Sequence, residues 1–179
     1  MLEERISQNR SAIISEWEDC VLRSYPEEAA KFLRSQKDQF ANPLGAALRE
    51  GLAEILDGLM ARQTDDELVP ALDRIIRIRA VQELAPSQAL AFIVELRQVI
   101  IDVTDPPLSK EEVLALAQRI DRLALAAFDV YSQCRDQLSS IRINEIRNRS
   151  LNRIERLNEW REKRDRSDDQ IHDREPTVT

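Results

Sequence analysis

The fold class is decided by residues 109–166, which read SKEEVLALAQRIDRLALAAFDVYSQCRDQLSSIRINEIRNRSLNRIERLNEWREKRDR. This stretch contains neither proline nor glycine, the two residues that most often interrupt a helix. As one continuous α-helix it would measure roughly 85 Å at about 1.5 Å per residue, which exceeds the diameter of a small domain. We therefore expect a long C-terminal helix that extends from a helical body.

The two halves of this stretch differ in their apolar pattern. Residues 113–130 carry apolar side chains in heptad-like steps, enough to pack on a helical bundle. The second half thins to Ile143, Ile146, Ile154 and Leu157, with arginines between them. A narrow apolar stripe with charged flanks is typical of a helix–helix seam between subunits. The alternative is a solvated helix without a partner.

Helical periodicity also fills the sequence before residue 109. Apolar residues recur at three- and four-residue steps from Leu2 to Leu22, which predicts one helix that ends before Tyr25 and Pro26. Asn42 and Pro43 are typical of an N-cap followed by the first helical position. Later helices are expected to begin at Pro70, at Pro86 and after Ser109. Two pairs have the spacing of a capping box: Thr64 with Glu67, and Ser109 with Glu112.

The composition agrees with one all-α domain. The chain has 179 residues, of which 33% are charged and 42% hydrophobic, and it has only three glycines. So few glycines argue against a β-sandwich, a Gly-rich phosphate loop or a Rossmann crossover, which need backbone turns with positive φ. We expect a single helical bundle over residues 1–140, an extension of the long helix over 141–166, and a disordered tail over 167–179.

Charge is distributed unevenly along these three segments. Residues 1–140 have a balance of −8, residues 141–166 of +4 and residues 167–179 of −3. An acidic body excludes a broad basic face, so a nucleic acid is not the expected partner, although binding of RNA or DNA by the basic segment is an alternative. We find no apolar run long enough to span a membrane and no secretory signal, and Cys20 and Cys134 do not form a CxxC pair. These features predict a reduced, cytoplasmic protein.

Histidine is nearly absent from the chain. The single one, His172, lies in the predicted tail, so the body offers none for haem ligation, a His-based zinc site or a Ser–His or Cys–His nucleophile. We therefore expect no metal, no cofactor and no enzymatic activity. Redox activity of Cys20 or Cys134 is an alternative to the commoner role of a buried structural thiol.

An arginine falls on the apolar face of the segment LDRIIRIRAVQELAPSQAL, residues 72–90. On a helix, Arg79 shares a stripe with Leu72, Ile75 and Ile76, where an unpaired charge would cost several kcal/mol. One interpretation is an internal polar clasp in which Glu83 pairs with Arg79, while Asp73 pairs with Arg77 in the same way. The other is a pocket for an anionic signal, bordered by Arg77, Arg79 and Gln82.

Several short blocks together resemble a known family. They are LDRIIRIRAVQ (72–82), PSQA (86–89), FDVYSQCRD (128–136) and RINEIRNR (142–149), with Trp17, SYP (24–26) and FANPLG (40–45) in the same order. The sequence resembles the RsbRD N-terminal-domain family, the sensory RsbT co-antagonist-type domains of bacterial stress signalling. The resemblance implies a helical sensor module, commonly placed ahead of a signalling output domain. Related stressosome sensor domains have a dimeric, globin-like form without haem, and we expect the same form here.

The function expected from these features is that of a non-catalytic sensory or regulatory module in a bacterial stress response. We expect it to form a homodimer and to act through its C-terminal helix on a separate protein partner, because the sequence carries no output domain after that helix. The alternative is a helical adaptor without a ligand that docks a larger protein complex.

Overall fold

The computed structural model describes the backbone of residues 1–35, 40–82 and 84–172, and the side chains of these residues except 159 and 162–172. The described residues form seven helices and no strands. The helices are α1 (Leu2–Gln8), α2 (Arg10–Leu22), α3 (Glu27–Ser35), α4 (Pro43–Met60), α5 (Asp65–Val81), α6 (Pro86–Val103) and α7 (Lys110–His172). The prediction of an all-α fold with a long C-terminal helix is confirmed.

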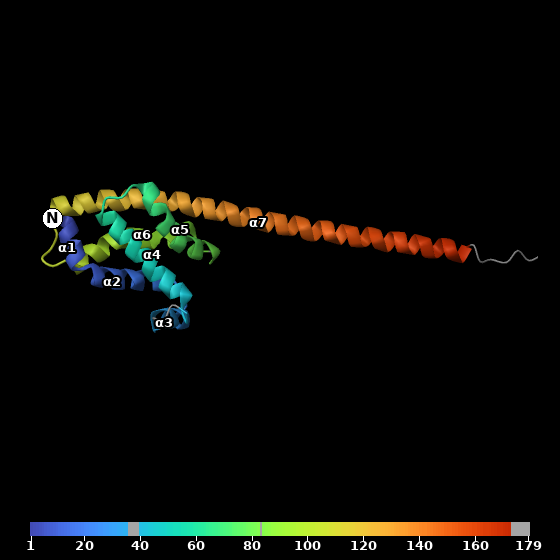
Figure 1. The fold of residues 1–179 in the computed structure, drawn as a ribbon, viewed down its shortest axis with the longest axis horizontal. Coiled ribbons are helices and arrows are strands. Elements are labelled where there is room, and N and C mark those ends of the chain that lie inside the picture. Colours follow the sequence, from blue (N-terminus) through green and yellow to red (C-terminus); the bar gives the residue numbers. More distant parts are fainter. Residues whose placement is uncertain (36–39, 83, 173–179) are drawn as a thin grey trace, which may run out of the picture. The chain divides into compact units, whose positions relative to one another are not determined.

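Contacts divide the chain into two compact units, Met1–Arg135 and Asp136–Thr179. The first unit holds α1 to α6 together with the first part of α7, which runs along the other helices of that unit (Figure 1). The second unit holds the rest of α7. The helix continues to His172, whereas the sequence expectation began a disordered tail at residue 167; no proline or glycine interrupts the chain before Pro176. Residues 173–179 of that predicted tail lie outside the described residues.

Helices α2, α4, α5 and α6 form the centre of the first unit. Helix α4 pairs with α5, and α2 packs against both α6 and α4. Trp17 of α2 stacks on Phe92 of α6 with ring centroids 5.9 Å apart. The indole Nε1 of Trp17 also donates a hydrogen bond of 2.7 Å to the carbonyl oxygen of Phe92. The largest side chain of the core is therefore both packed and satisfied in its polar atom.

The first part of α7 closes this core along one face. Leu116, Ile120, Leu123 and Ala127 are buried at the predicted heptad-like steps. Further along, the hydroxyl of Tyr131 donates to the carbonyl oxygen of Leu84 over 3.1 Å. This half of the long helix is thus an integral part of the first unit.

Three helix starts, those of α4, α5 and α7, follow the capping residues read from the sequence. The side chain of Asn42 accepts from the amide of Gly45 over 2.8 Å, with Pro43 in the first turn of α4. Thr64 and Glu67 form a complete capping box, in which the Thr64 amide donates to the Glu67 carboxylate over 2.7 Å. Ser109 and Glu112 cap α7 reciprocally in the same manner. These local interactions satisfy amides that a helix cannot pair internally.

Two predicted helix boundaries are wrong. The single helix expected from Leu2 to Leu22 is divided at Asn9, whose backbone has φ −104° and ψ 10° and ends α1 before α2 begins. The helix expected to begin at Pro70 begins at Asp65, after the Thr64 cap, and Pro70 lies inside it. Pro70 is the sixth residue of α5 and has no amide hydrogen to donate to the carbonyl oxygen of Asp66, so the helix continues through it without that bond.

Candidate functional site

Arg79, one of the three residues predicted to border a pocket for an anion, lies in the core with 2% of its surface exposed. Its guanidinium donates to the carbonyl oxygens of Ala89 (2.7 Å) and Gln88 (2.8 Å) and to the hydroxyl of Ser24 (3.0 Å). It also lies 5.5 Å from the ring centre of Phe92. Burial lowers the pKa of Arg79 from its ordinary value, because removal from water disfavours the charged form. Arg79 thus joins α5 to the start of α6 and to the segment after α2.

The other two residues of that prediction are exposed, unlike Arg79. Arg77 is exposed and forms a double hydrogen bond with Asp73 at 3.1 and 2.9 Å, the pairing expected from their spacing. Gln82 is exposed at the C-cap of α5. Glu83, the expected partner of Arg79, lies outside the described residues. The geometry matches the internal clasp, except that backbone carbonyls and a hydroxyl accept the hydrogen bonds.

The two cysteines have environments that disfavour the thiolate. Cys134 is buried and its sulfur lies 3.5 Å from the Asp73 carboxylate. Burial raises the pKa of both Cys20 and Cys134, and for Cys134 the Asp73 carboxylate raises it further. Since the thiolate is the reactive form, these surroundings favour structural thiols over redox-active ones.

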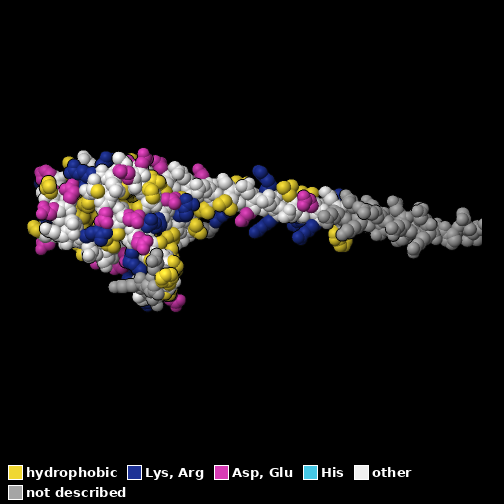
Figure 2. All heavy atoms as spheres, in the orientation of Figure 1, with side chains coloured by type: hydrophobic (Ala, Val, Ile, Leu, Met, Phe, Trp, Pro, Cys, Tyr) yellow, Lys and Arg dark blue, Asp and Glu magenta, His cyan; other side chains and the backbone are white. Residues whose placement is uncertain are grey.

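The four residues predicted to form a subunit seam share one face of α7. Ile143, Ile146, Ile154 and Leu157 are between 53% and 65% exposed. On a helix with about 3.6 residues per turn they fall within an arc of about 80°. They therefore form an apolar stripe in the second unit, interrupted by Ser150 at its middle and named here the α7 stripe. Basic side chains border hydrophobic ones along this part of the helix (Figure 2).

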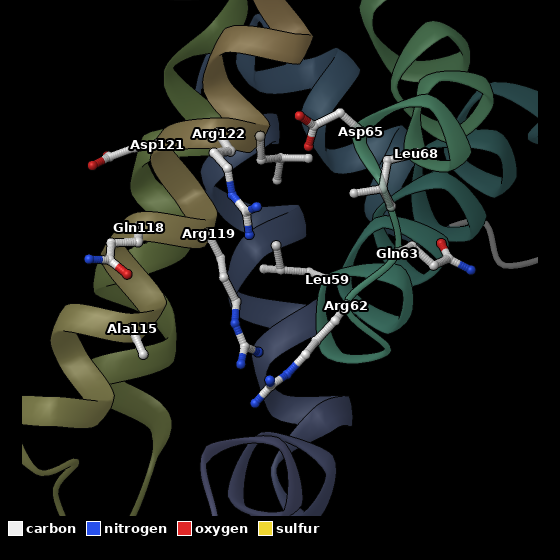
Figure 3. Close-up of a pocket in the computed structure, with 11 residues that line it drawn as sticks. Leu59, Arg62, Gln63, Asp65, Leu68, Ala115, Gln118, Arg119, Asp121 and Arg122 are labelled. Atoms are coloured by element: carbon white, nitrogen blue, oxygen red, sulfur yellow. The ribbon is translucent and has the colours of Figure 1, made fainter.

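A polar pocket of about 670 Å³ lies in the first unit between the α4–α5 turn and α7. Leu59, Leu68 and Leu123 line its apolar part. Arg62 enters from the turn, and Arg119 and Arg122 enter from α7 (Figure 3). We call these three side chains the arginine cluster.

Arg62 owes its position to an unusual backbone conformation. Helix α4 ends at Met60, and Arg62 follows with a left-handed φ of 56°. The amide of Gln63 donates to the carbonyl oxygen of Gly58 over 3.0 Å, which completes a Schellman-type helix end. Glycine is the usual residue at this left-handed position, because a side chain there costs roughly 1–2 kcal/mol. Gly58 also fits this turn, since a Cβ atom there would displace the side chains of Gln63 and Leu68.

Glu3 of α1 neutralises part of the arginine cluster. Its Oε1 accepts from Nη2 of Arg119 over 2.6 Å and from Nη2 of Arg62 over 3.0 Å. The pKa of Glu3 is lowered to about 2 by the hydrogen bond from Arg119, by the backbone amide of Glu3 itself and by the hydrogen bond from Arg62. Two cationic groups thus hold one carboxylate in its charged form.

Two groups in the pocket lack such a partner. Nη1 of Arg119 is buried and has no hydrogen-bond acceptor among the described residues, although the side chain is only 10% exposed. Arg122 is exposed and forms neither an ion pair nor a hydrogen bond with the described part of the chain. Of the acidic residues that line the pocket, Asp121 points away from its centre (Figure 3).

Sequence reasoning missed the arginine cluster. The only local signal is the i, i+3 spacing of Arg119 and Arg122, which places both on one side of a helix. Arg62 lies far from them in the sequence, and its approach depends on the left-handed turn. As for metals, no group of three or more His, Cys, Asp or Glu side chains within the described residues could hold an ion.

These features define an all-helical domain whose polar sites are built from arginines. The family model described as "RsbT co-antagonist protein rsbRD N-terminal domain" matches residues 11–146. The chain therefore belongs to this family, as its resemblance predicted, and its family indicates a regulatory domain of stress signalling. No curated protein and no solved structure matches the chain. Within the described residues, no helix is both long enough and apolar enough to cross a membrane.

Proposed function

We propose that the protein is a non-catalytic sensory module of the cytoplasm that forms a homodimer through the α7 stripe and regulates a protein partner. The observation that carries this proposal is the stripe itself, an exposed row of large apolar side chains on a helix with few other means of stabilisation. A long polar helix in water is marginal unless one face is buried against another element. Burial of each such side chain contributes at most about 1.5–3 kcal/mol.

The spacing of the stripe indicates how two copies would pack. Ile143 and Ile154 are eleven residues apart, and so are Ile146 and Leu157. Eleven residues correspond to about three turns of an α-helix, whereas a heptad repeat produces a left-handed supercoil. We therefore expect the paired helices to run nearly straight, or with a slight right-handed twist, rather than as a left-handed heptad coiled coil.

The test is sedimentation equilibrium of the full chain and of two matched variants. Ile146→Asp places a carboxylate in the stripe, and Asn148→Asp places the same group on the opposite face of α7. We expect a dimer for the unmodified chain and for Asn148→Asp, and a monomer for Ile146→Asp. A monomeric unmodified chain at high micromolar concentration, or equal association of the two variants, would contradict the proposal.

Salt dependence distinguishes self-association from docking on an acidic partner. Residues 141–166 carry nine basic and five acidic side chains, so two copies repel each other across the seam. Added salt screens this repulsion and strengthens a homodimer, whereas it weakens a complex with an acidic protein. The ligand-free adaptor, the alternative proposal, predicts in addition that no small molecule raises the melting temperature of the protein.

A further inference from the structure

We propose that the arginine cluster binds a small organic anion, with its carboxylate or phosphate head on Arg119 and Arg122 and an apolar body against the leucines of the pocket. This deepens the proposed sensory function, on which it rests for its biological role, because it assigns the chemical class of the signal.

The strongest support is the unsatisfied donor of Arg119. A buried charged donor without an acceptor is costly, because it has lost its hydrogen bonds to water without replacement, so natural proteins pair such groups. Glu3 accepts from Nη2 of this guanidinium, whereas Nη1 is buried and has no acceptor among the described residues. A small turn of the Arg119 side chain toward the pocket would let an anion accept from Nη1 in the charge-assisted geometry that guanidinium groups favour.

Arg122 supplies the second contact. It lines the same pocket from the same helix, one turn after Arg119, and it forms no ion pair with the described residues, although the Asp65 carboxylate also points into the pocket (Figure 3). If the cluster served only to fix α1 through Glu3, Arg62 and Arg119 would suffice and Arg122 would have no role in it.

The shape and lining of the pocket select for an amphipathic ligand. Its volume of about 670 Å³ lies within the usual range of about 300–1,000 Å³ for small-molecule sites. Leu59 and Leu68 line the pocket next to the guanidinium groups (Figure 3), and with 6% and 3% of their surface exposed they offer a small apolar contact at its wall. An inorganic ion would satisfy the arginines without using this contact, whereas a short acyl or alkyl chain would cover it.

The experiment is isothermal titration calorimetry of the full chain with sodium octanoate and with octyl phosphate at millimolar concentrations. Acetate provides the head group alone, and 1-octanol provides the chain alone. We expect one site per chain for at least one of the two long anions and no binding of acetate or 1-octanol at the same concentrations. The two long anions distinguish a carboxylate ligand from a phosphate ligand.

Two variants locate the site. Arg122→Gln removes a charge that makes no ion pair, so the fold is retained, and the affinity is expected to fall about tenfold with the loss of one charge-assisted contact. Arg34→Gln removes an equal charge on α3, away from the pocket, and should bind as the unmodified chain does. Absence of binding by both long anions, or equal affinities of the two variants, would overturn the proposal.

Oligomeric state separates this proposal from the previous one. Ile146→Asp lies outside the pocket and should bind the anion even as a monomer, while Arg122→Gln should remain a dimer. A monomeric unmodified chain would therefore refute the proposed function and leave the ligand proposal intact. A dimeric chain that binds neither long anion would refute the ligand proposal alone.

Discussion

Arg79→Lys tests whether the buried arginine acts as a structural clasp. The guanidinium makes three hydrogen bonds in three directions, at 2.7, 2.8 and 3.0 Å. An ammonium is a point donor and can satisfy one of these acceptors well from this position. Loss of two hydrogen bonds to a charged group, at about 1.5 kcal/mol each, predicts destabilisation by about 3 kcal/mol.

The assay is urea unfolding followed by the fluorescence of Trp17, which stacks on Phe92 beside the clasp. Because the chain has two tryptophans, every protein in this comparison also carries Trp160→Phe, so that the fluorescence comes from Trp17 alone. With a urea dependence of about 2 kcal/mol per M, the unfolding midpoint should fall by about 1.5 M.

Arg77→Lys is the matched control, since Arg77 lies on the same helix but is exposed and paired with Asp73. Its unfolding midpoint should not change measurably, because an exposed ion pair contributes little to stability. Equal midpoints for Arg79→Lys and Arg77→Lys would refute the clasp and return Arg79 to the list of candidate ligand-binding residues.

Three further predictions concern Glu3, Asn42 and Arg62. Because the pKa of Glu3 is lowered from 4.5 to about 2, its contribution to stability is complete above about pH 4.5 and is lost as the pH falls toward 2. Glu3→Gln should therefore lower the melting temperature at pH 7, and thermal melts between pH 2 and 4.5 should show a weaker dependence of melting temperature on pH. Asn42→Ala removes the cap of α4 and the hydrogen bond from Nδ2 to the carbonyl oxygen of Leu33 (2.9 Å), so unfolding by urea should show a loss of about 2 kcal/mol, and a loss below about 0.5 kcal/mol would contradict this. Arg62→Gly relieves the left-handed backbone at a gain of about 1 kcal/mol, which offsets the exposed ion pair to Glu3. Calorimetric melting should therefore show an unchanged or higher melting temperature, together with weaker binding of whichever long anion binds the unmodified chain.

Local signals in the sequence predict most of the fold. Asn42, Thr64 and Ser109 each satisfy amides within three residues, so their roles can be read without knowledge of the rest of the chain. The division at Asn9 could not be read in this way, because apolar residues keep their helical spacing on both sides of it. At this division the side-chain amide of Asn9 donates to the carbonyl oxygen of Arg5 over 3.0 Å, and the buried Ile6 and Ile13 lie on either side of it.

The pocket could not be predicted from the sequence, because the residues that form it are far apart in the chain. Its donors come from a turn and from a helix more than fifty residues later, and the carboxylate that joins Arg62 to Arg119 comes from the first helix. The prediction of an anion site in residues 77–82 recognised a true anomaly, a cation on an apolar face. The sequence does not show that backbone carbonyl oxygens of α6 lie within hydrogen-bonding distance of that cation.

The left-handed Arg62 has an evolutionary consequence. Codons for arginine and glycine can differ by a single base, so drift alone would readily replace this residue with the one that its backbone prefers. A chain that needs only to stay folded gains from that replacement, and natural proteins lie close enough to their stability threshold for such a gain to matter. Retention of arginine here across distant relatives would mark selection for what its side chain does, and its frequent exchange for glycine would mark a dispensable group.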